Sequence, residues 1–204
     1  MNAPALPLPL EGLCFKGDRD YLHGTDILPI ALCTLCGERS LDAVGDIDIV
    51  FHGLARAGLT LHAEMPPNTK LRVQLACTVD GVRRKFVLVE DGRPIVERYP
   101  YLEGQIVAAT VIDVTAAIAT SIAVMPFTNV ERWIAMVKAL HHMVYPQAKG
   151  KWLFARAKLV SYRDVYLEPR EHRVVLQADF HGKLTRSALV IDGQRIGDIF
   201  FVLA

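Results

Sequence analysis

The two halves of this sequence resemble each other at a spacing of about half the chain length. Residues 72–95 match residues 173–196 at 9 of 24 positions without a gap, and an Asp-Gly pair falls at the same place in both segments. Upstream, residues 54–59 (LARAGL) match residues 154–159 (FARAKL) at an offset that differs by one residue. Shared strand composition produces some of these matches, but coinciding turn glycines are harder to explain in that way. The pattern therefore predicts a duplicated unit of roughly 100 residues.

A unit present in only two copies is expected to close on itself as an intrachain pseudo-dimer, whereas longer arrays form solenoids. We expect a first repeat at residues 1–104 and a second repeat, including the linker, at residues 105–204. Because 51% of the 204 residues are apolar, two small units can share a large buried face. The same apolar content favours further association into a homo-oligomer.

Each predicted repeat has one helix followed by antiparallel strands. In the second repeat, Thr128 and Glu131 have the spacing of a capping box, and an apolar helical periodicity continues to Pro146. In the first repeat, the expected helix runs from Thr25 to Cys36. This order of elements predicts an α+β fold. The expected strands are residues 46–62, 70–79, 83–90 and 93–102 in the first repeat and 151–167, 172–180 and 184–203 in the second, with turns at 80–81, 91–92, 181–182 and 192–193.

This order resembles the hotdog fold, in which a curved antiparallel sheet wraps a central helix, and the duplication resembles its double-hotdog variant. The resemblance implies a tandem hotdog repeat with two central helices, each wrapped by its own sheet. Hotdog proteins mostly act on acyl thioesters of coenzyme A or acyl carrier protein, as thioesterases, dehydratases and hydratases. The resemblance therefore implies acyl-CoA or acyl carrier protein as the partner, a part in fatty acid metabolism, and no cofactor.

A dense polar run, residues 16–26, lies immediately before the first predicted helix and has no counterpart before the second. We interpret this asymmetry as one working site and one altered site. Helix N-termini carry unpaired N–H groups and a positive dipole, which suit them to polarise a thioester carbonyl. Gly24 would let a substrate approach that backbone closely. We expect Tyr21 and Thr25 to contact the substrate as well.

His23-Gly24 is similar to part of the His-Gly-Gly sequence that opens the helix in one group of hotdog thioesterases, although Thr25 replaces the second glycine here. The similarity implies that His23 serves as a general base or as a hydrogen-bond donor. Hydrolysis assisted by a carboxylate would also need an acidic side chain to orient a water molecule. The candidates are Asp18, Asp20, Asp26 and, across the pseudo-dimer interface, Glu131.

Two other interpretations of these residues stay open. A 3-hydroxyacyl thioester dehydratase would need a histidine before one helix and a carboxylate from the other, as His23 and Glu131 could provide, but the His-Phe-Pro-Gly sequence of carrier-protein dehydratases is absent. Alternatively, His23 and the nearby aspartates cap the helix and hold the loop. The protein would then be a catalytically silent acyl-binding or assembly module. The sequence thus leaves it uncertain whether the protein is an enzyme.

The basic pair Arg83-Arg84 follows a predicted turn, where it could meet a phosphate of coenzyme A or the acidic surface of a carrier protein. A solvated hairpin is the alternative. Cys33 and Cys36 form a single CxxC at the end of the first helix, where we favour core packing over redox chemistry. His141-His142 point in different directions on the second helix, and one of them is expected in the core. No ligand spacing suggests a metal.

Charge and terminal composition restrict the partners further. The net charge is +1 with acids and bases interspersed, so nucleic-acid binding is not expected. Residues 1–12 lack the basic start of a secretory signal, which favours a cytoplasmic location. Residues 106–125 are long enough to span a bilayer, but Asp113 lies near their centre and alanine and threonine fill much of the rest. We therefore expect buried strands and a linker there.

Overall fold

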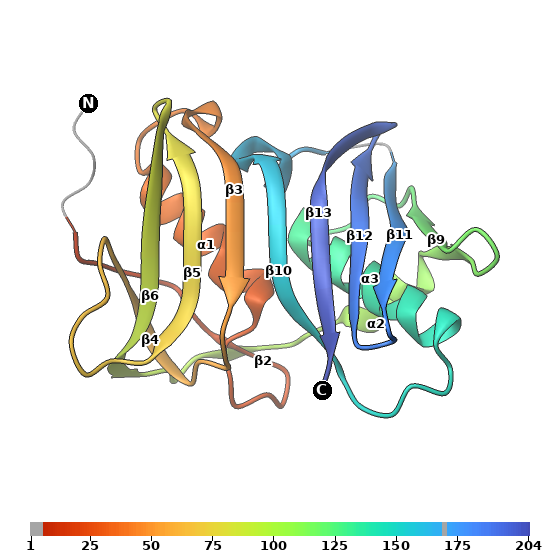
Figure 1. Ribbon diagram of the computed structural model, residues 1–204, viewed down its shortest axis with the longest axis horizontal. Coiled ribbons are helices and arrows are strands. Elements are labelled where there is room, and N and C mark those ends of the chain that lie inside the picture. Colours follow the sequence, from red (N-terminus) through yellow and green to blue (C-terminus); the bar gives the residue numbers. More distant parts are fainter. Residues whose placement is uncertain (1–5, 169–170) are drawn as a thin grey trace. The chain divides into compact units, whose positions relative to one another are not determined.

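The structure, a computed structural model, describes residues 6–168 and 171–204 (Figure 1). The chain divides into two compact units, Met1–Tyr101 and Leu102–Ala204. This division lies close to the boundary expected from the sequence, between residues 104 and 105. Each unit contains one long helix and a set of antiparallel strands.

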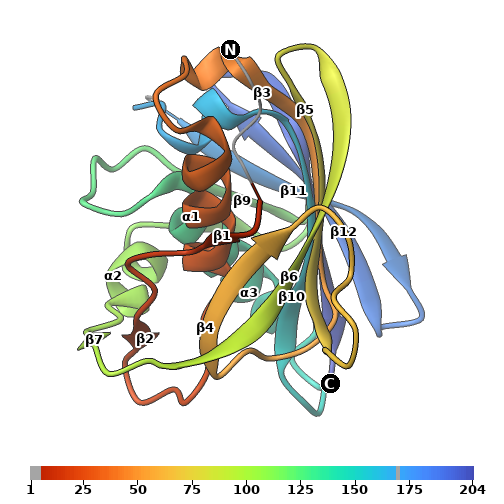
Figure 2. The ribbon, with the colours of Figure 1, turned by 90° about the vertical axis from the view of Figure 1, so that its left-hand side faces the viewer.

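In the first unit, one helix packs against one face of a curved antiparallel sheet, as Figure 2 shows for α1. The strand order within this unit is β3-β5-β6-β4-β1, and each neighbouring pair is antiparallel. A separate parallel pair is formed by β2 and β7. The elements are β1 (Leu8–Pro9), β2 (Phe15–Lys16), α1 (Gly24–Cys36), η1 (Leu41–Ala43), β3 (Val44–Phe51), β4 (Ala57–His62), β5 (Leu71–Val79), β6 (Val82–Pro94) and β7 (Arg98–Tyr99).

The core of the first unit follows from the alternation of apolar residues in the strands and from their helical spacing in α1. Along β5, alternate side chains are buried, because successive residues of a strand point to opposite faces of the sheet. Along α1, most of the helix surface is buried, which requires cover on more than one side. The buried residues of these two elements are Val73, Leu75, Cys77 and Val79 on β5 and Thr25, Ile27, Leu28, Pro29, Ala31, Leu32, Leu35 and Cys36 on α1.

In the second unit the strand order is β10-β13-β12-β11-β9-β8, again with antiparallel neighbours. Its long helix, α3, contacts β9, β10 and β11 and is buried along most of its length. The elements are α2 (Glu103–Ala108), β8 (Val111–Asp113), β9 (Ile118–Ser121), α3 (Asn129–Val144), β10 (Trp152–Ser161), η2 (Tyr162–Val165), β11 (His172–Phe180), β12 (Leu184–Ile191) and β13 (Gln194–Leu203).

Both long helices agree with the sequence prediction. At the start of α3, the Thr128 hydroxyl accepts from the Glu131 backbone N–H, and Glu131 Oε2 accepts from the Thr128 N–H at 2.9 Å. The capping box is therefore confirmed. It defines the start of the helix because it satisfies backbone donors of the first turn that have no partner within the helix.

Residues 106–125 do not form a single helix. They contain the end of α2 and both β8 and β9. Ala119 and Ser121 are buried, but Val111 and Ile122 are mostly exposed, so the expectation of buried strands is only partly correct. Within the described part of the chain, no helix is both long enough and apolar enough to cross a membrane.

Several strand boundaries differ from the prediction. The expected strand 46–62 is divided into β3 and β4, and 93–102 contributes only the end of β6 and the short β7. Asp91-Gly92 is not a hairpin turn: β6 continues through it, and its pairing with β4 changes register there. Gly92 has φ +81°, which glycine adopts without strain, so this dipeptide forms an irregularity within one strand. The turns at 80–81, 181–182 and 192–193 are confirmed.

The strand order does not confirm the internal repeat. In the first unit, β5 lies between β3 and β6, whereas β11, to which it was matched, lies between β12 and β9. Likewise, LARAGL overlaps the start of β4 and FARAKL lies in β10, which occupy different positions in their sheets. The matched segments share the alternating apolar composition of strands and similar turn glycines. The strand order therefore leaves the internal repeat a prediction.

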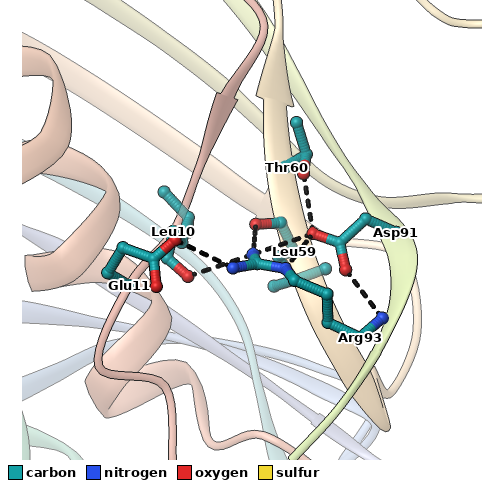
Figure 3. Close-up of polar contacts among 6 residues, drawn as sticks. All are labelled: Leu10, Glu11, Leu59, Thr60, Asp91 and Arg93. Atoms are coloured by element: carbon teal, nitrogen blue, oxygen red, sulfur yellow. Dashed lines mark hydrogen bonds and ion pairs between the residues drawn. The ribbon is translucent and has the colours of Figure 1, made fainter.

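The irregularity in β6 is held by the guanidinium of Arg93, which Figure 3 shows among its partners. It donates to Asp91 Oδ2 and to Glu11 Oε1, each at 2.8 Å, and to the carbonyl oxygens of Leu10 and Leu59. Asp91 also accepts from the Thr60 hydroxyl at 2.7 Å. The network therefore joins the segment after β1 to both β4 and β6.

A glycine in β13 provides a first test of the packing. Gly197 lies opposite Leu159 of β10, and an added Cβ would lie 2.1 Å from the carbonyl oxygen of Lys158. Because this contact is with backbone, we expect Gly197→Ala to lower the free energy of unfolding by about 2 kcal/mol in urea denaturation. The control is Gly104→Ala in α2, where the added Cβ meets nothing within 4 Å. Equal stabilities of the two variants would contradict the packing of β10 against β13.

Candidate functional site

A buried lysine lies immediately before α1, within the polar run singled out from the sequence. Lys16 is 0% exposed, and it belongs to β2, which pairs with β7 so that Lys16 lies beside Tyr99. Its Nζ is 2.7 Å from Asp26 Oδ1 and donates to Thr25 Oγ1 at 2.5 Å. Both partners lie in the first turn of α1. An ammonium group this deep requires such partners, since burying an unpaired charge costs several kcal/mol.

Aromatic and basic side chains surround the ammonium group. Tyr99 donates its hydroxyl proton to Asp26 Oδ1 at 2.9 Å, and Lys16 Nζ lies 5.3 Å from the ring centroids of both Tyr99 and Tyr101. The guanidinium of Arg19 also stacks on the second of these rings, 4.7 Å from the centroid of Tyr101. These rings present negative faces to the cations and shield the ion pair from water.

The loop between β2 and α1 is fixed by backbone contacts. Gly17 donates its N–H to the carbonyl of Tyr99 at 2.9 Å. Arg98 donates to the carbonyl oxygens of Gly17 and Arg19, and its guanidinium lies over the ring of Phe15. Leu22 donates to the carbonyl of Ala55 at 2.8 Å. The loop is therefore tied to β7 and to the segment just before β4, so the residues that follow it have a defined position.

His23 is the residue that precedes α1, and it is connected to the buried lysine through one hydroxyl group. Its Nδ1 lies 2.8 Å from Thr25 Oγ1, and its ring lies 5.4 Å from that of Tyr101. Unlike Lys16, His23 is only partly buried, so solvent reaches the side chain. The site thus has an interior charge pair and an outer imidazole, joined by Thr25.

The direction of the hydrogen bonds limits what His23 can do. Lys16 can only donate, so Thr25 Oγ1 accepts a hydrogen bond from it. The Thr25 hydroxyl can then donate a hydrogen bond to His23 Nδ1. With Nδ1 as the acceptor, a neutral imidazole carries its proton on Nε2. In that tautomer Nε2 is a donor, suited to a carbonyl oxygen or a developing oxyanion.

The alternative that His23 and the nearby aspartates cap α1 is wrong as far as the cap is concerned. No side chain caps the N-terminus of α1: His23 occupies the capping position without a capping hydrogen bond. Thr25 and Asp26 contact Lys16 instead. Asp26 still lies favourably at the positive end of the helix dipole, but it is held by a buried ion pair and by Tyr99.

The remaining predicted residues of the polar run are placed less centrally. Asp20 forms an exposed ion pair with Arg56 (3.2 Å), with 77% of its own side chain exposed. Tyr21 is partly exposed on the loop, and Gly24 is the first residue of α1. Asp18 is exposed on the same loop. Among the predicted carboxylates, Asp26 is the one that Lys16 and Thr25 link to His23.

Arg83 and Arg84 lie at the start of β6, after the turn at 80–81, and are exposed. Arg83 donates to the carbonyl of Asp46. This turn lies near the C-terminal end of α1, because Asp80 accepts from Arg39 at 3.0 Å, three residues beyond the helix. The structure therefore places both arginines at the opposite end of α1 from His23.

Glu131 belongs to the second unit. Its Oε2 accepts from the backbone and the hydroxyl of Thr128, at 2.9 Å and 3.0 Å, within the capping box. The carboxylate thus has a structural role at the start of α3.

No family model matches this sequence, and no curated protein matches it. Solved structures do match. The tesB protein of Mycobacterium avium subspecies paratuberculosis is 8% identical, with a TM-score of 0.50 over 95% of this chain and 91% of that one. The fold is hotdog-like. The dehydratase domain of RzxB from Pseudomonas fluorescens (14% identity, TM-score 0.47) matches over 92% of each chain. The dehydratase domain of PpsC from Mycobacterium tuberculosis, in complex with C12:1-CoA (8%, 0.48), matches over 90% of this chain and 85% of that one.

Within this hotdog-like fold, the cysteines and paired histidines behave largely as expected. Cys36 is buried at the last position of α1, where its thiol donates to the carbonyls of Arg39 and Ser40. Burial raises the pKa of the Cys36 thiol, the opposite of what redox chemistry needs. Cys33, however, is exposed, so core packing explains only one of the pair. His141 is buried and His142 is exposed, which confirms the expectation of one core histidine.

Sequence reasoning missed Lys16, Tyr99 and Tyr101. No local pattern distinguishes a buried lysine from an exposed one, and its tyrosine partners follow about 80 residues later. His172 was also missed. It is 0% exposed at the first position of β11, where a histidine at a strand boundary reads as a surface residue.

Proposed function

We propose that the first unit binds an acyl thioester of coenzyme A or acyl carrier protein at the start of α1, and hydrolyses it. The observation that carries this proposal is the hydrogen-bonded series Asp26–Lys16–Thr25–His23, which leads from a buried ion pair to a partly exposed imidazole at a helix N-terminus. Such an arrangement is hard to explain as a scaffold alone, because a plain helix cap would not need a buried lysine.

The proposed roles follow from position. His23 donates to the thioester carbonyl, together with the backbone N–H groups at the start of α1, where the helix dipole favours developing negative charge. Gly24 lacks a side chain that would obstruct this approach. Thr25 and Lys16 orient the imidazole. Tyr21 lines the outer part of the loop, and Asp20 is the exposed carboxylate nearest in sequence that could order a water molecule.

A dehydratase is the second candidate reaction. It would require Glu131, whose carboxylate is already engaged with Thr128 at the start of α3. Hydrolysis is therefore the first choice. A silent acyl-binding module is the remaining alternative from a different class, and an assay separates the three.

The test is a panel of acyl-CoA thioesters, with release of free coenzyme A thiol followed over time. We expect His23→Ala to reduce kcat/KM about 100-fold, because a positioned proton donor or acceptor contributes on that scale. Thr25→Val, which removes the hydroxyl link but keeps the shape, is expected to reduce it by a smaller factor. Circular dichroism and urea denaturation establish that each variant folds.

The matched control is His52→Ala, which removes an exposed histidine of the same unit. Its kcat/KM should equal that of the unaltered protein. Saturable acyl-CoA binding without thiol release would favour the silent module, and formation of an enoyl product from a 3-hydroxyacyl thioester would favour the dehydratase. Equal activities of His23→Ala and His52→Ala would remove His23 from the mechanism.

The proposal also includes the arrangement of repeats, the oligomeric state and the partner protein. A tandem hotdog repeat, at residues 1–104 and 105–204, and its closure as a pseudo-dimer remain predictions, as do a homo-oligomer and a carrier-protein partner contacted by Arg83 and Arg84. Reaction with acyl carrier protein in place of coenzyme A, compared between the unaltered protein and an Arg83→Ala/Arg84→Ala variant, tests the carrier contact.

A further inference from the structure

A second buried polar group lies in the other unit, around the first turns of α3. Arg132 is 5% exposed, His172 0% and Ser121 2%. Arg132 and Ser121 come from segments that flank the loop leading into α3, and His172 begins β11. None of these residues has a part in the proposed thioester site.

Strand pairing and one hydrogen bond bring the three residues to the same region of the second unit. Ser121 of β9 is directly opposite His172 of β11, and because both are buried, they point to the same, interior face of the sheet. Arg132 reaches this point from α3, since its Nη2 donates to the carbonyl of Ala123 at 2.8 Å, two residues beyond Ser121. Its charge also acts on His172 strongly enough to contribute to lowering the pKa of that imidazole.

The group consists of hydrogen-bond donors. Trp133 Nε1 can only donate, and it lies 3.2 Å from His172 Nδ1, so Nδ1 is the acceptor. Burial, aided by Arg132, lowers the pKa of His172 to about 3, so the ring is neutral and its proton lies on Nε2. Arg132 Nε–H and the Ser121 hydroxyl are two further donors.

These donors lack acceptors among the described residues. Arg132 Nε, His172 Nε2 and Ser121 Oγ are all buried, and none has a hydrogen-bond partner in the described part of the chain. The guanidinium also forms no ion pair there, and burial alone lowers the pKa of Arg132, with no carboxylate to offset it. Buried polar groups are nearly always satisfied, and a buried cation is costly without an anion.

We propose that Arg132, His172 and Ser121 form a binding site for a carboxylate group at the start of α3. One carboxylate offers enough lone pairs for all three donors and supplies the charge that Arg132 lacks. The neutral His172 contributes direction without charge, so the site suits a monoanion better than a phosphate.

The experiment uses the whole chain and acetate as the probe, replacing chloride at constant ionic strength. The readout is the side-chain Nε–H signal of Arg132 in a ¹⁵N–¹H spectrum, identified by its absence from an Arg132→Lys variant or, if that variant does not fold, by through-bond assignment. We expect a saturable shift. A signal that does not change would overturn the proposal, since chloride would then serve equally well or neither anion would bind.

Two serine variants provide the matched comparison. Ser121→Ala should weaken acetate binding roughly tenfold, the loss expected for one hydrogen bond to a charged group. Ser187 is also fully buried and its hydroxyl is likewise without a partner in the described chain, but it lies on β12, two strands from β9. Ser187→Ala should bind acetate within about twofold of the unaltered protein. Unchanged affinity in Ser121→Ala would overturn the proposed donor set, whatever the outcome of the thioester assay.

Discussion

Replacing Lys16 by methionine is expected to lower the free energy of unfolding by about 3–5 kcal/mol, a large fraction of the total stability of a typical domain. The loss arises because the Asp26 carboxylate remains. Asp26, whose side chain is 13% exposed, would keep its negative charge near the core with Tyr99 as a donor but without the Lys16 ammonium group. Urea denaturation measured by circular dichroism gives the loss.

The double variant Lys16→Met/Asp26→Asn separates charge from packing. It removes both charges and retains an acceptor for Tyr99, so it should recover much of the stability lost by Lys16→Met alone. Lys70→Met, at an exposed lysine of the same unit, is the control and should change stability little. If Lys16→Met were as stable as this control, the ion pair beneath α1 would not exist as described.

Acidification from pH 7 to pH 5 is expected to remove about 4 kcal/mol of stability through two histidines of the second unit. Burial lowers the pKa of His141 to about 4 and that of His172 to about 3, whereas both titrate near 6.5 in the unfolded chain. Between these values the unfolded state binds more protons than the folded state, so stability falls as the pH falls. Each histidine accounts for about 2 kcal/mol at pH 5.

Two carboxylates with lowered pKa values do not obscure this window, whereas burial raises the pKa of Asp164 and so opposes the loss on acidification. The Arg56 backbone N–H and the Arg72 guanidinium lower the pKa of Glu90, and hydrogen bonds from Arg93 lower that of Asp91, against the opposing effect of burial. Their contribution to stability is therefore lost only below the unfolded pKa values of these groups, near about pH 4. The measurement is urea denaturation at both pH values. His141→Gln should roughly halve the decrease in stability, and His142→Gln, which alters an exposed neighbour, should leave it unchanged. A decrease of the same size in both variants would contradict the burial of His141.

The parts of the fold that local chemistry determines were predictable from the sequence. The capping box at Thr128 and Glu131 depends on residues three positions apart, and α1 ends before Gly37 for a comparably local reason. The Asp91-Gly92 dipeptide was misread, because the same glycine conformation serves both a hairpin turn and an irregularity inside a strand. Which one forms depends on the partner strand.

The candidate site was predictable only in its outer part. His23, Gly24 and Thr25 stood out because they form a polar run before a helix. Lys16 did not stand out, because its burial depends on contacts with Tyr99 and Tyr101, which lie at the other end of the unit in the sequence. The internal repeat stays a prediction. The matched segments have different neighbours in the strand order, and sequence similarity alone does not determine which strands pair.

The pairing of β2 with β7 also sets an order of events during synthesis. Tyr99, which donates to Asp26, follows it by 73 residues, so the ribosome releases Lys16 and α1 long before their aromatic cover exists. Until then the nascent segment carries an ammonium and a carboxylate that water still hydrates. The Lys16–Asp26 ion pair can therefore lose its water only late in the folding of the first unit. In a chain that stops before residue 98, the ion pair would stay hydrated.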